Sequence, residues 1–446
     1  AQQVPHTTAN YALAARFSPK KLEKMVFSTQ ADPHWLKSGE RFWYEYETSD
    51  GKVFYLADPE KKTRQPLFDH VQMAAELTRL SKDPYDAQHL PIKEIKFNDT
   101  GTAFIFGIES SQDEEPKEGE EQKGKPKKKL LWFEYDMNKK LLRMLDDYEK
   151  PKEKPRWANI SPDGQKVVFA REFNLFWMDR ENYEKALKDE KDSTIVEHRI
   201  TTDGEEYYEY GSGERGETNV DKEKNKKKRK SAYGLWSHDS KKFALIRSDE
   251  RKVKDLWVIN SIAEPRPTLE TYKYHMPGEK EAPAYEILVF DIDAGSRVKV
   301  EADQFPDQSL SLLSAPRKER TRDDEHRPSL WLSSSSEKLY FTRTSRDLKR
   351  IDLCVADAST GKVTTLIEER MNTYVETRNP GLVNDGEEII HWSERDGWAH
   401  FYLYDGKGNL KNRITSGPWH CEDIAGIDEK ARVLYFTANG REAGED

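Results

Sequence analysis

An all-β fold is predicted for this chain, a β-propeller of seven or more four-stranded blades. Three observations predict it. A polar turn followed by a short aromatic or β-branched strand recurs at seven places along the 446 residues. The last two intervals between these turns are about 50 and 44 residues, close to the ~40–50 residues of a four-stranded propeller blade. Segments with helical periodicity are few and short.

The seven turns are rich in Gly, Asp, Asn and Ser, which accept the backbone conformations of tight turns. They lie at residues 37–39, 99–101, 162–164, 238–240, 334–336, 384–386 and 428–430. The strands expected after them are 42–46, 103–108, 167–170, 243–246, 339–342, 389–392 and 433–436. Several units continue into a third strand, as at 353–356 and 401–404.

Residues 1–34 are predicted to form an N-terminal extension with a helix, and residues 35–446 the propeller. Ser18-Pro19 is typical of a helix start, because proline is favoured at the first helical position. A helix from there would place Leu22, Met25 and Val26 on one face.

Two more helices are expected along the chain. Asp69 and Gln72 resemble a capping box before Met73 and Leu77, and residues 180–190 have helical character. The longer intervals between turns contain charged or proline-rich tracts, which we expect to be solvated excursions from the β scaffold. These tracts are residues 110–129, 211–230, 265–283 and 304–328.

The final unit supplies only two strands, 424–427 and 433–437, before the chain stops. A two-stranded blade leaves an open sheet edge, which native proteins avoid. We therefore expect the propeller to be incomplete in its C-terminal blade and the natural protein to continue.

The composition argues against a nucleic-acid-binding protein, a membrane-spanning protein and a disulfide-rich protein. The formal net charge of -9 gives no reason to expect nucleic acid as a partner, and no apolar run approaches the ~18 residues of a membrane span. Two cysteines, Cys354 and Cys421, cannot form a disulfide scaffold and are interpreted as small buried hydrophobic residues. The absence of an initiator methionine favours an exported protein and also fits a trimmed chain.

No motif for a nucleophile elbow, a zincin, a C-x-x-C pair, an EF-hand or a Walker A loop occurs, so no catalytic residue, metal or cofactor is predicted in this chain. Residues 211–216 match G-x-G-x-x-G, but no helix is expected behind them to bind a phosphate. In the run from His420 to Asp423, strand alternation lets only His420 and Glu422 converge, and polar residues at a strand edge are the favoured interpretation.

Glu205, Glu206 and Glu209 form the most interesting carboxylate cluster. Neighbouring carboxylates can hold a substrate ammonium by charge-assisted hydrogen bonds, although a solvated turn is the simpler interpretation. The basic run 222–230 is expected to be a mobile solvated loop, with anion or partner binding as the alternative. Asn98 and Asn159 lie in glycosylation sequons, which matter in a eukaryotic secretory host.

The order of segments in the last hundred residues is specific. Residues 347–366 include Arg-Ile-Asp-Leu-Cys-Val-Ala-Asp, and residues 393–404 read Ser-Glu-Arg-Asp-Gly-Trp-Ala-His-Phe-Tyr-Leu-Tyr. With 413–419 and 433–439, and with 157–164 and 235–240 upstream, the chain resembles the N-terminal propeller of the dipeptidyl peptidase IV family, in the prolyl oligopeptidase group of serine peptidases. The likeness runs from about Phe97 to the end.

The resemblance implies an eight-bladed propeller followed by an α/β-hydrolase domain bearing Ser, Asp and His, which would lie beyond Asp446. It implies cleavage of peptides near a free N-terminus, with the propeller gating access and an acidic pair binding the substrate ammonium. Its implied partners are peptide substrates, the chain's own hydrolase domain and a second copy in a homodimer. It also implies an extracytoplasmic location, periplasmic or secreted.

The sequence departs from the family at the acidic pair. The family's pair comes shortly before the blade that begins at Leu235, where this chain has residues 211–230 with basic residues nearest the blade. Glu205, Glu206 and Glu209 are therefore candidates on local chemistry alone. Arg378, in a loop that the family turns toward its cavity, is a fourth candidate for substrate binding. The alternative function is a stand-alone propeller that binds a protein or glycan partner through its loops.

Overall fold

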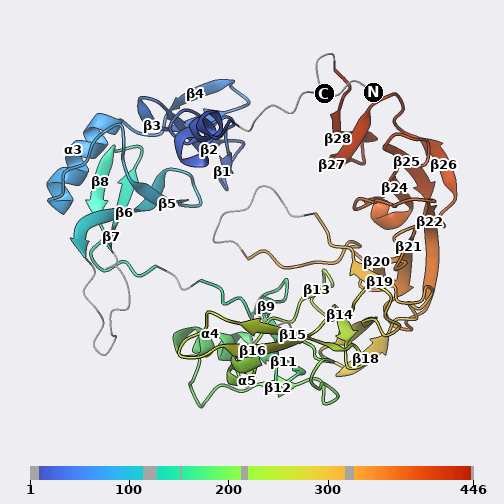
Figure 1. Ribbon diagram of the computed structural model, residues 1–446. Helices are drawn as coiled ribbons and strands as arrows, with labels where there is room; N and C mark the ends of the chain where they lie inside the picture. Colours follow the sequence, from blue (N-terminus) through green and yellow to red (C-terminus); the bar gives the residue numbers. More distant parts are fainter. Residues whose placement is uncertain (1–9, 114–127, 151–152, 212–218, 317–325, 443–446) are drawn as a thin grey trace. The chain divides into compact units, whose positions relative to one another are not determined.

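The computed structural model is mostly β and describes residues 10–113, 128–150, 153–211, 219–316 and 326–442 (Figure 1). Outside this range lie residues 114–127 and 212–218 of the two charged tracts, including the G-x-G-x-x-G pattern beyond Gly211, residues 317–325 of the tract 304–328, and both chain ends. The chain divides into two compact units, residues 1–151 with 318–325 and residues 152–317 with 326–446. The predicted boundary between residues 34 and 35 stays a prediction.

The first unit contains two four-stranded antiparallel sheets, each with its strands in sequence order. One consists of β1 (His34–Trp35), β2 (Phe42–Thr48), β3 (Gly51–Asp58) and β4 (Thr63–Pro66). The other consists of β5 (Ile92–Phe97), β6 (Ala103–Asp113), β7 (Lys128–Asp136) and β8 (Leu141–Met144). Its helical segments are α1 (Tyr11–Ala14), η1 (Ala15–Phe17), α2 (Pro19–Leu22) and α3 (His70–Ser81).

The predicted start of α3 is confirmed. The Asp69 carboxylate accepts hydrogen bonds from the amides of Val71 and Gln72, and Met73 and Leu77 are buried among the phenylalanines of both sheets. The N-terminal helix is shorter than predicted. It ends at Leu22, and Met25 and Val26 beyond it are 68% and 55% exposed, so no buried face extends the helix.

The second unit contains four four-stranded antiparallel sheets among its described residues. They are formed by β9 (Asn159–Ile160), β10 (Lys166–Arg171), β11 (Asn174–Asp179) and β12 (His198–Arg199); β13 (Gly234–Trp236), β14 (Lys242–Asp249), β17 (Ala284–Asp291) and β18 (Ser296–Lys299); β19 (Ser309–Leu312), β20 (Lys338–Thr344), β21 (Arg350–Asp357) and β22 (Val363–Arg370); and β23 (Gly381–Val383), β24 (Glu388–Ser393), β25 (His400–Asp405) and β26 (Leu410–Arg413).

The shorter elements of this unit are two hairpins and three helical segments. The hairpins are β15 (Asp255–Asn260) with β16 (Thr268–Lys273), and β27 (His420–Asp428) with β28 (Val433–Asn439). The helical segments are α4 (Arg180–Lys188), α5 (Asn219–Asn225) and η2 (Asn384–Gly386). All seven strands predicted after polar turns are present in the two units, as β2, β6, β10, β14, β20, β24 and β28, and the further strands as β21 and β25.

Successive sheets of the second unit pack on one another through shared apolar clusters. Trp236 and Phe290 pack with residues of β10 and β11, and Trp331 lies between the sheets that contain β14 and β20. Ile389 packs against the sheet of β20, and Phe401 packs near β28. This succession of four-stranded sheets is the packing that a propeller uses.

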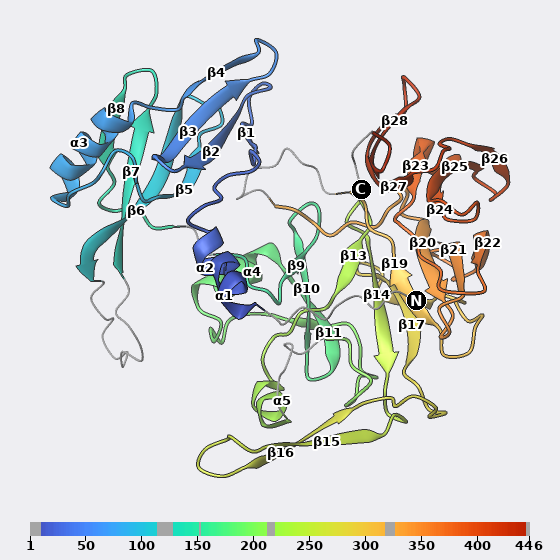
Figure 2. The same cartoon turned by 45° about the horizontal axis from the view of Figure 1, so that its top comes forward.

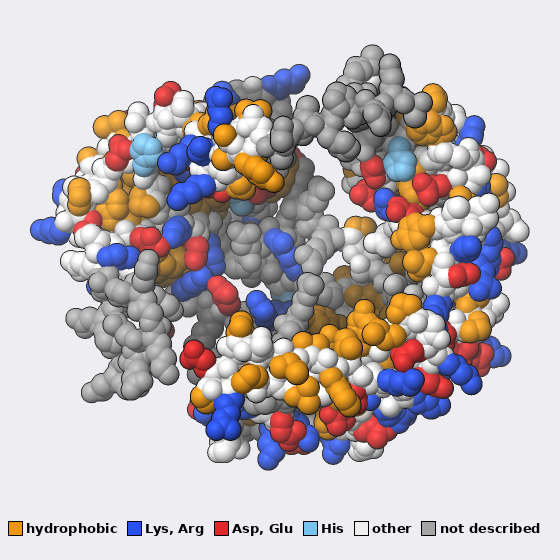
Figure 3. Space-filling view, viewed as in Figure 1, with side chains coloured by type: hydrophobic (Ala, Val, Ile, Leu, Met, Phe, Trp, Pro, Cys, Tyr) orange, Lys and Arg blue, Asp and Glu red, His pale blue; other side chains and the backbone are white. Residues whose placement is uncertain are grey.

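The hairpin β15–β16 adds a regular element to one of the expected excursions. Residues 265–283 were expected to be a solvated excursion, and part of this tract forms the strand β16, which with β15 projects from the sheet of β14 (Figure 2). Trp257, Ile259 and Leu269 on this hairpin are 71%, 69% and 59% exposed. Hydrophobic side chains gather over the hairpin in the space-filling view (Figure 3).

The basic run 222–230 is also more ordered than predicted. Its first residues belong to α5, and the Lys230 and Ala170 backbones exchange two hydrogen bonds. The Arg229 side chain pairs with Glu197 at 2.8 Å and lies 5.1 Å from the Trp157 ring centre. The end of this run is held in place because the Arg229 guanidinium contacts both a carboxylate and an aromatic face.

Asn159 joins two neighbouring sheets of the second unit. Its side-chain amide donates to the carbonyls of Ala232 and Gly234 at 3.2 and 3.0 Å, and its carbonyl accepts from the Trp236 indole at 3.0 Å. Since both polar atoms of this side chain form hydrogen bonds, Asn159 links β9 to β13 and to the residues just before β13.

Both cysteines are buried and free, as predicted. Burial raises the pKa of the Cys354 thiol to about 11, so it stays protonated near neutral pH. None of the described helices is long and apolar enough to cross a membrane.

Candidate functional site

The predicted carboxylates lie on the segment 203–211, which follows β12. Gly204 is required there, because a Cβ atom at this position would lie 2.1 Å from the Phe173 carbonyl oxygen. A tight turn joins Glu205 and Tyr208 through their backbones, and the Tyr210 amide donates to the Phe173 carbonyl at 3.0 Å. The segment is thereby fixed against the turn between β10 and β11.

Cations from β14 and from the residues just after it stack on the tyrosines of this segment. The Arg247 guanidinium lies 3.6 Å from the Tyr208 ring centre and 4.4 Å from that of Tyr210. The Arg251 guanidinium lies 4.1 Å from the Tyr208 ring centre. Such cation–π contacts are strongest when the cation is desolvated, and the Arg247 side chain is only 3% exposed.

Carboxylates neutralise this cluster of cations. Glu286 pairs with Arg247 at 2.6 Å and with Lys299 at 3.0 Å, and it accepts a hydrogen bond from the Tyr208 hydroxyl at 2.8 Å. Burial acts to raise the pKa of Glu286, but the hydrogen bonds from Lys299, Tyr208 and Arg247 outweigh it and lower the pKa.

Asp203 is the second carboxylate that pairs with Arg247. It pairs with Arg297 at 2.8 Å and Arg247 at 3.2 Å, and it accepts from the Tyr210 hydroxyl at 2.9 Å. Burial acts to raise its pKa, yet the hydrogen bonds from Arg297 and Tyr210 and the charge of Arg247 lower the pKa to about 2. Asp203 is therefore ionised throughout the physiological range.

A cavity of about 320 Å³ opens beside this network. We call it the tyrosine cavity, because four of its lining side chains are tyrosines. It is lined by Tyr207, Glu209, Tyr210, Gly211, Lys222, Tyr233, Ile246, Ser248, Glu250, Tyr272 and Lys273. The lining combines aromatic faces with two carboxylates and two ammonium groups, a mixture suited to binding a charged organic molecule.

The three predicted carboxylates differ in their surroundings. Glu205 forms a short ion pair with Arg251, and the Glu206 side chain hydrogen-bonds to Tyr207. Only Glu209 of the three lines the tyrosine cavity. Their role in binding an ammonium stays a prediction.

Arg378 belongs to a different cluster. It pairs with Glu376 at 3.2 Å and with Glu422 at 3.6 Å, and its guanidinium lies 4.8 Å from the Trp392 ring centre. It is not among the residues of the tyrosine cavity, so the structure does not bring Arg378 together with Glu209 around one pocket. Its substrate contact also stays a prediction.

Sequence reasoning missed Glu250 and Tyr272 in the cavity lining. Ile246, Ser248 and Glu250 are spaced two residues apart along β14 and its end, so alternation alone places them on one face. That signal was available in the sequence. Tyr272 lies in the hairpin β15–β16, in a tract that composition marked as a solvated excursion.

Strand alternation allowed only His420 and Glu422 of the His420–Asp423 run to converge, and these side chains lie 3.6 Å apart. Across the described ranges, no group of three or more His, Cys, Asp or Glu side chains is arranged to hold a metal ion.

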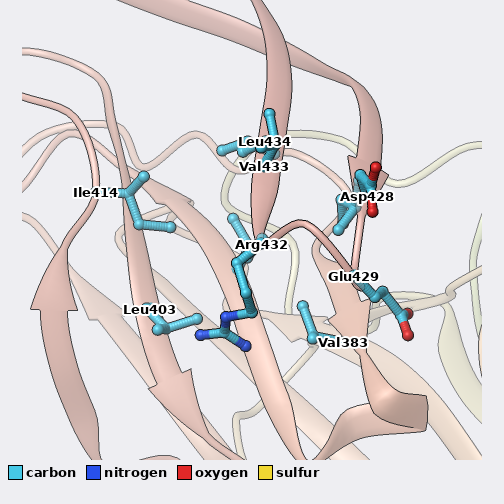
Figure 4. Close-up of a pocket in the computed structure, with 10 residues that line it drawn as sticks. Val383, Leu403, Ile414, Asp428, Glu429, Arg432, Val433 and Leu434 are labelled. Atoms are coloured by element: carbon cyan, nitrogen blue, oxygen red, sulfur yellow. The ribbon is translucent and has the colours of Figure 1, made fainter.

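A second cavity, of about 160 Å³, lies between the sheet of β24 and the hairpin β27–β28 (Figure 4). Its walls are mainly aliphatic, including Val383, Leu403, Ile414 and Leu434. Arg432 at this cavity is paired with Glu388. The lining therefore provides a packing space between two sheets rather than a set of groups for acid–base chemistry.

Comparisons with known proteins identify relatives of this chain. A probable dipeptidyl-aminopeptidase B from Neosartorya fischeri is 26% identical over 334 residues, which cover 67% of this chain and 31% of that protein. Dipeptidyl peptidase 4 from Arthroderma otae is 24% identical over 220 residues, covering 46% of this chain and 26% of the relative. The chain thus spans about a quarter to a third of the length of these curated relatives.

Among solved structures, dipeptidyl peptidase 4 from Porphyromonas gingivalis matches with a TM-score of 0.49 and 18% identity, over 93% of this chain and 50% of that one. A putative dipeptidyl aminopeptidase IV from Bacteroides ovatus matches with a TM-score of 0.48 and 17% identity, over 89% of this chain and 49% of that one. The family described as the dipeptidyl peptidase IV N-terminal region matches residues 125–446. Because this match covers well over half of the chain, the protein belongs to the dipeptidyl peptidase IV N-terminal region family.

Proposed function

We propose that this chain is the non-catalytic region of an exported serine peptidase that removes dipeptides from the free N-termini of peptides. The observation that carries the proposal is the family match over residues 125–446. The catalytic Ser, Asp and His would belong to an α/β-hydrolase domain of the same polypeptide, which is the first partner of this chain. Location in the periplasm or secretion is part of the proposal and is checked by assaying fractionated cells.

The proposed architecture is an eight-bladed propeller that gates access to the hydrolase. The face-to-face packing of successive four-stranded sheets supports this architecture. In such a protein the propeller would admit extended peptides and exclude folded ones. Glu205, Glu206, Glu209 and Arg378 are the proposed contacts for the substrate N-terminus. Glu209 has the strongest support, because it alone of the four lines the tyrosine cavity.

The test is a peptidase assay on the full-length native polypeptide. We expect release of the chromophore from dipeptidyl p-nitroanilides with proline or alanine at the second position. Acetylation of the substrate amino group should abolish the activity, because the enzyme would need the free ammonium. Equal hydrolysis of free and acetylated substrates, or no hydrolysis of either, would contradict the proposal.

A homodimer is also proposed, and the exposed hairpin β15–β16 supports it. An isolated two-stranded hairpin is marginally stable in water, and large exposed apolar patches mark interaction sites. Changing Trp257 and Ile259 to serine should convert a dimer to a monomer in light-scattering measurements. Trp398, which is 47% exposed outside the hairpin, provides the control substitution to serine. A mass unchanged by the hairpin variant would remove the hairpin from the interface.

A further inference from the structure

The tyrosine cavity contains binding groups that the chain's own contacts leave available. Tyr233 and Tyr272 line it with rings that are 72% and 40% exposed. The Glu250 amide donates to the Tyr207 carbonyl at 2.9 Å, which fixes Glu250 beside the cavity. Within the described residues, the Glu250 carboxylate has no hydrogen-bonding or ion-pair partner.

The charges around the cavity favour a cationic ligand. Glu209 and Glu250 contribute two negative charges, and Lys222 and Lys273 contribute two positive ones. Lys273 is already paired with Asp255 at 3.1 Å, whereas the Glu250 carboxylate has no such partner among the described residues. A cationic ligand would supply that partner to Glu250.

The neighbouring tyrosine rings already bind cations of the protein itself. The Lys273 ammonium lies 4.7 Å from the Tyr207 ring centre, and the Arg247 guanidinium lies 4.4 Å from that of Tyr210. Tyr233 and Tyr272 offer the same kind of surface to a ligand, since the negative face of an aromatic ring attracts cations. Ile246 adds an aliphatic wall for the stem of such a ligand.

We propose that the tyrosine cavity binds the guanidinium or ammonium head of an arginine or lysine side chain, with Glu250 as its counter-ion and Tyr272 as its aromatic wall. The volume of about 320 Å³ lies at the small end of the ~300–1,000 Å³ typical of small-molecule sites. The assignment of this side chain to a peptide substrate rests on the proposed function, whereas the affinity of the cavity for the cation does not.

The experiment is isothermal titration calorimetry of this chain with N-acetyl-L-argininamide, whose only charge is the guanidinium. Its neutral isostere, N-acetyl-L-citrullinamide, is the matched control ligand. We expect saturable one-to-one binding of the arginine compound and at least about tenfold weaker binding of the citrulline compound, since a charge-assisted contact is lost.

Two variants with opposite expected effects test the residues. Glu250→Gln should weaken binding about tenfold, whereas Lys222→Gln should strengthen it about two- to threefold by removing a like charge. Glu281→Gln, an exposed position outside the cavity lining, should leave binding unchanged. Tyr272→Leu should weaken binding while Tyr374→Leu, at an exposed tyrosine elsewhere, should not.

Equal binding of the two ligands, or loss of affinity in the Lys222 variant, would overturn the proposal. Tighter binding of L-alaninamide would assign the cavity to a peptide amino terminus instead and would also overturn it. A full-length protein without peptidase activity whose cavity still binds the arginine compound would refute the proposed function alone. An active peptidase whose cavity does not bind the arginine compound would refute this inference alone.

Discussion

Arg247 is the residue on which the contacts around the tyrosine cavity converge. Its guanidinium is stacked on two tyrosines of the segment 203–211 and paired with Asp203 and Glu286. Because these partners come from one loop and from β17, Arg247 positions the loop that presents Glu209 to the cavity. Lysine has a compact ammonium and would not reproduce the planar stacking.

Substitution of Arg247 by methionine should lower the free energy of unfolding by about 3 kcal/mol, because it leaves the half-buried Glu286 with one cation fewer. Arg251→Met is the control, since the Arg251 side chain is 42% exposed and an exposed pair contributes about 0–1 kcal/mol. Urea denaturation of the two variants measures the difference. Equal losses would show that Arg247 is an ordinary surface arginine.

At the residue scale, the sequence predicts features that depend on neighbouring residues. It does not predict contacts between residues that are distant in the chain. The buried thiols and the Asp69 cap were predictable because each depends on its own strand or helix turn. The network of Arg247 was not, because its partners are up to 44 positions away in the chain. No local sequence pattern predicts which carboxylate will form an ion pair with a buried arginine.

At the scale of elements, the hairpin β27–β28 depends on the sheet beside it. Glu388 on β24 pairs with Arg432 at the start of β28 and with Lys411 on β26, and these two hydrogen-bonded cations lower the pKa of Glu388 to about 2. The carboxylate thus ties two strands of one sheet to the neighbouring hairpin. Its stabilising effect is complete above the ordinary glutamate pKa of 4.5 and is lost as the pH falls toward 2.

Glu388→Gln should therefore increase amide hydrogen exchange in residues 420–439 about fivefold at pH 7, the effect of an ion pair of about 1 kcal/mol. The difference between variant and parent should disappear when both are compared at successively lower pH from about 4.5 to 2. Glu387→Gln, next in the chain and exposed, should exchange like the parent. A difference that persists at pH 2 would contradict the role of the carboxylate.

Strands were predicted better than the tracts between them. Turns rich in Asp, Gly and Ser mark strand starts locally, which is why all seven following strands were found. The strand β16 and the helix α5 lie in tracts whose composition is polar overall. Composition averages over a tract, and it concealed the apolar residues of β16, such as Leu269, which is paired with Ile259 of β15.

At the scale of the whole molecule, the sheets of the second unit form a chain of nearest neighbours. Four of its apolar clusters each join a sheet to the next sheet or hairpin along the sequence, as in repeat proteins. A local defect should accordingly spread to adjacent sheets and fade beyond them. The succession was predictable from turn spacing, whereas the identity of the packing residues between sheets was not.

Ile389→Ala tests this at a fully buried position between the sheets of β20 and β24. The cavity should cost about 2–5 kcal/mol, and hydrogen exchange should rise in residues 309–413 while residues 159–199 keep their protection. Val196→Ala, at a 51% exposed position, is the control. A uniform rise across all sheets would show instead that the unit unfolds as one cooperative body.

The hydrogen bonds of Asn159 between two sheets affect the choice of host for producing the protein. Asn159-Ile160-Ser161 is an acceptor sequence for N-linked sugar, yet the folded chain uses the same amide nitrogen to hold Ala232 and Gly234. In a yeast or insect secretory pathway, oligosaccharide is attached while the chain is still emerging, before β9 meets β13. A glycan at that moment would occupy the nitrogen and block the meeting of the two sheets. Expression in a bacterial host avoids this glycosylation.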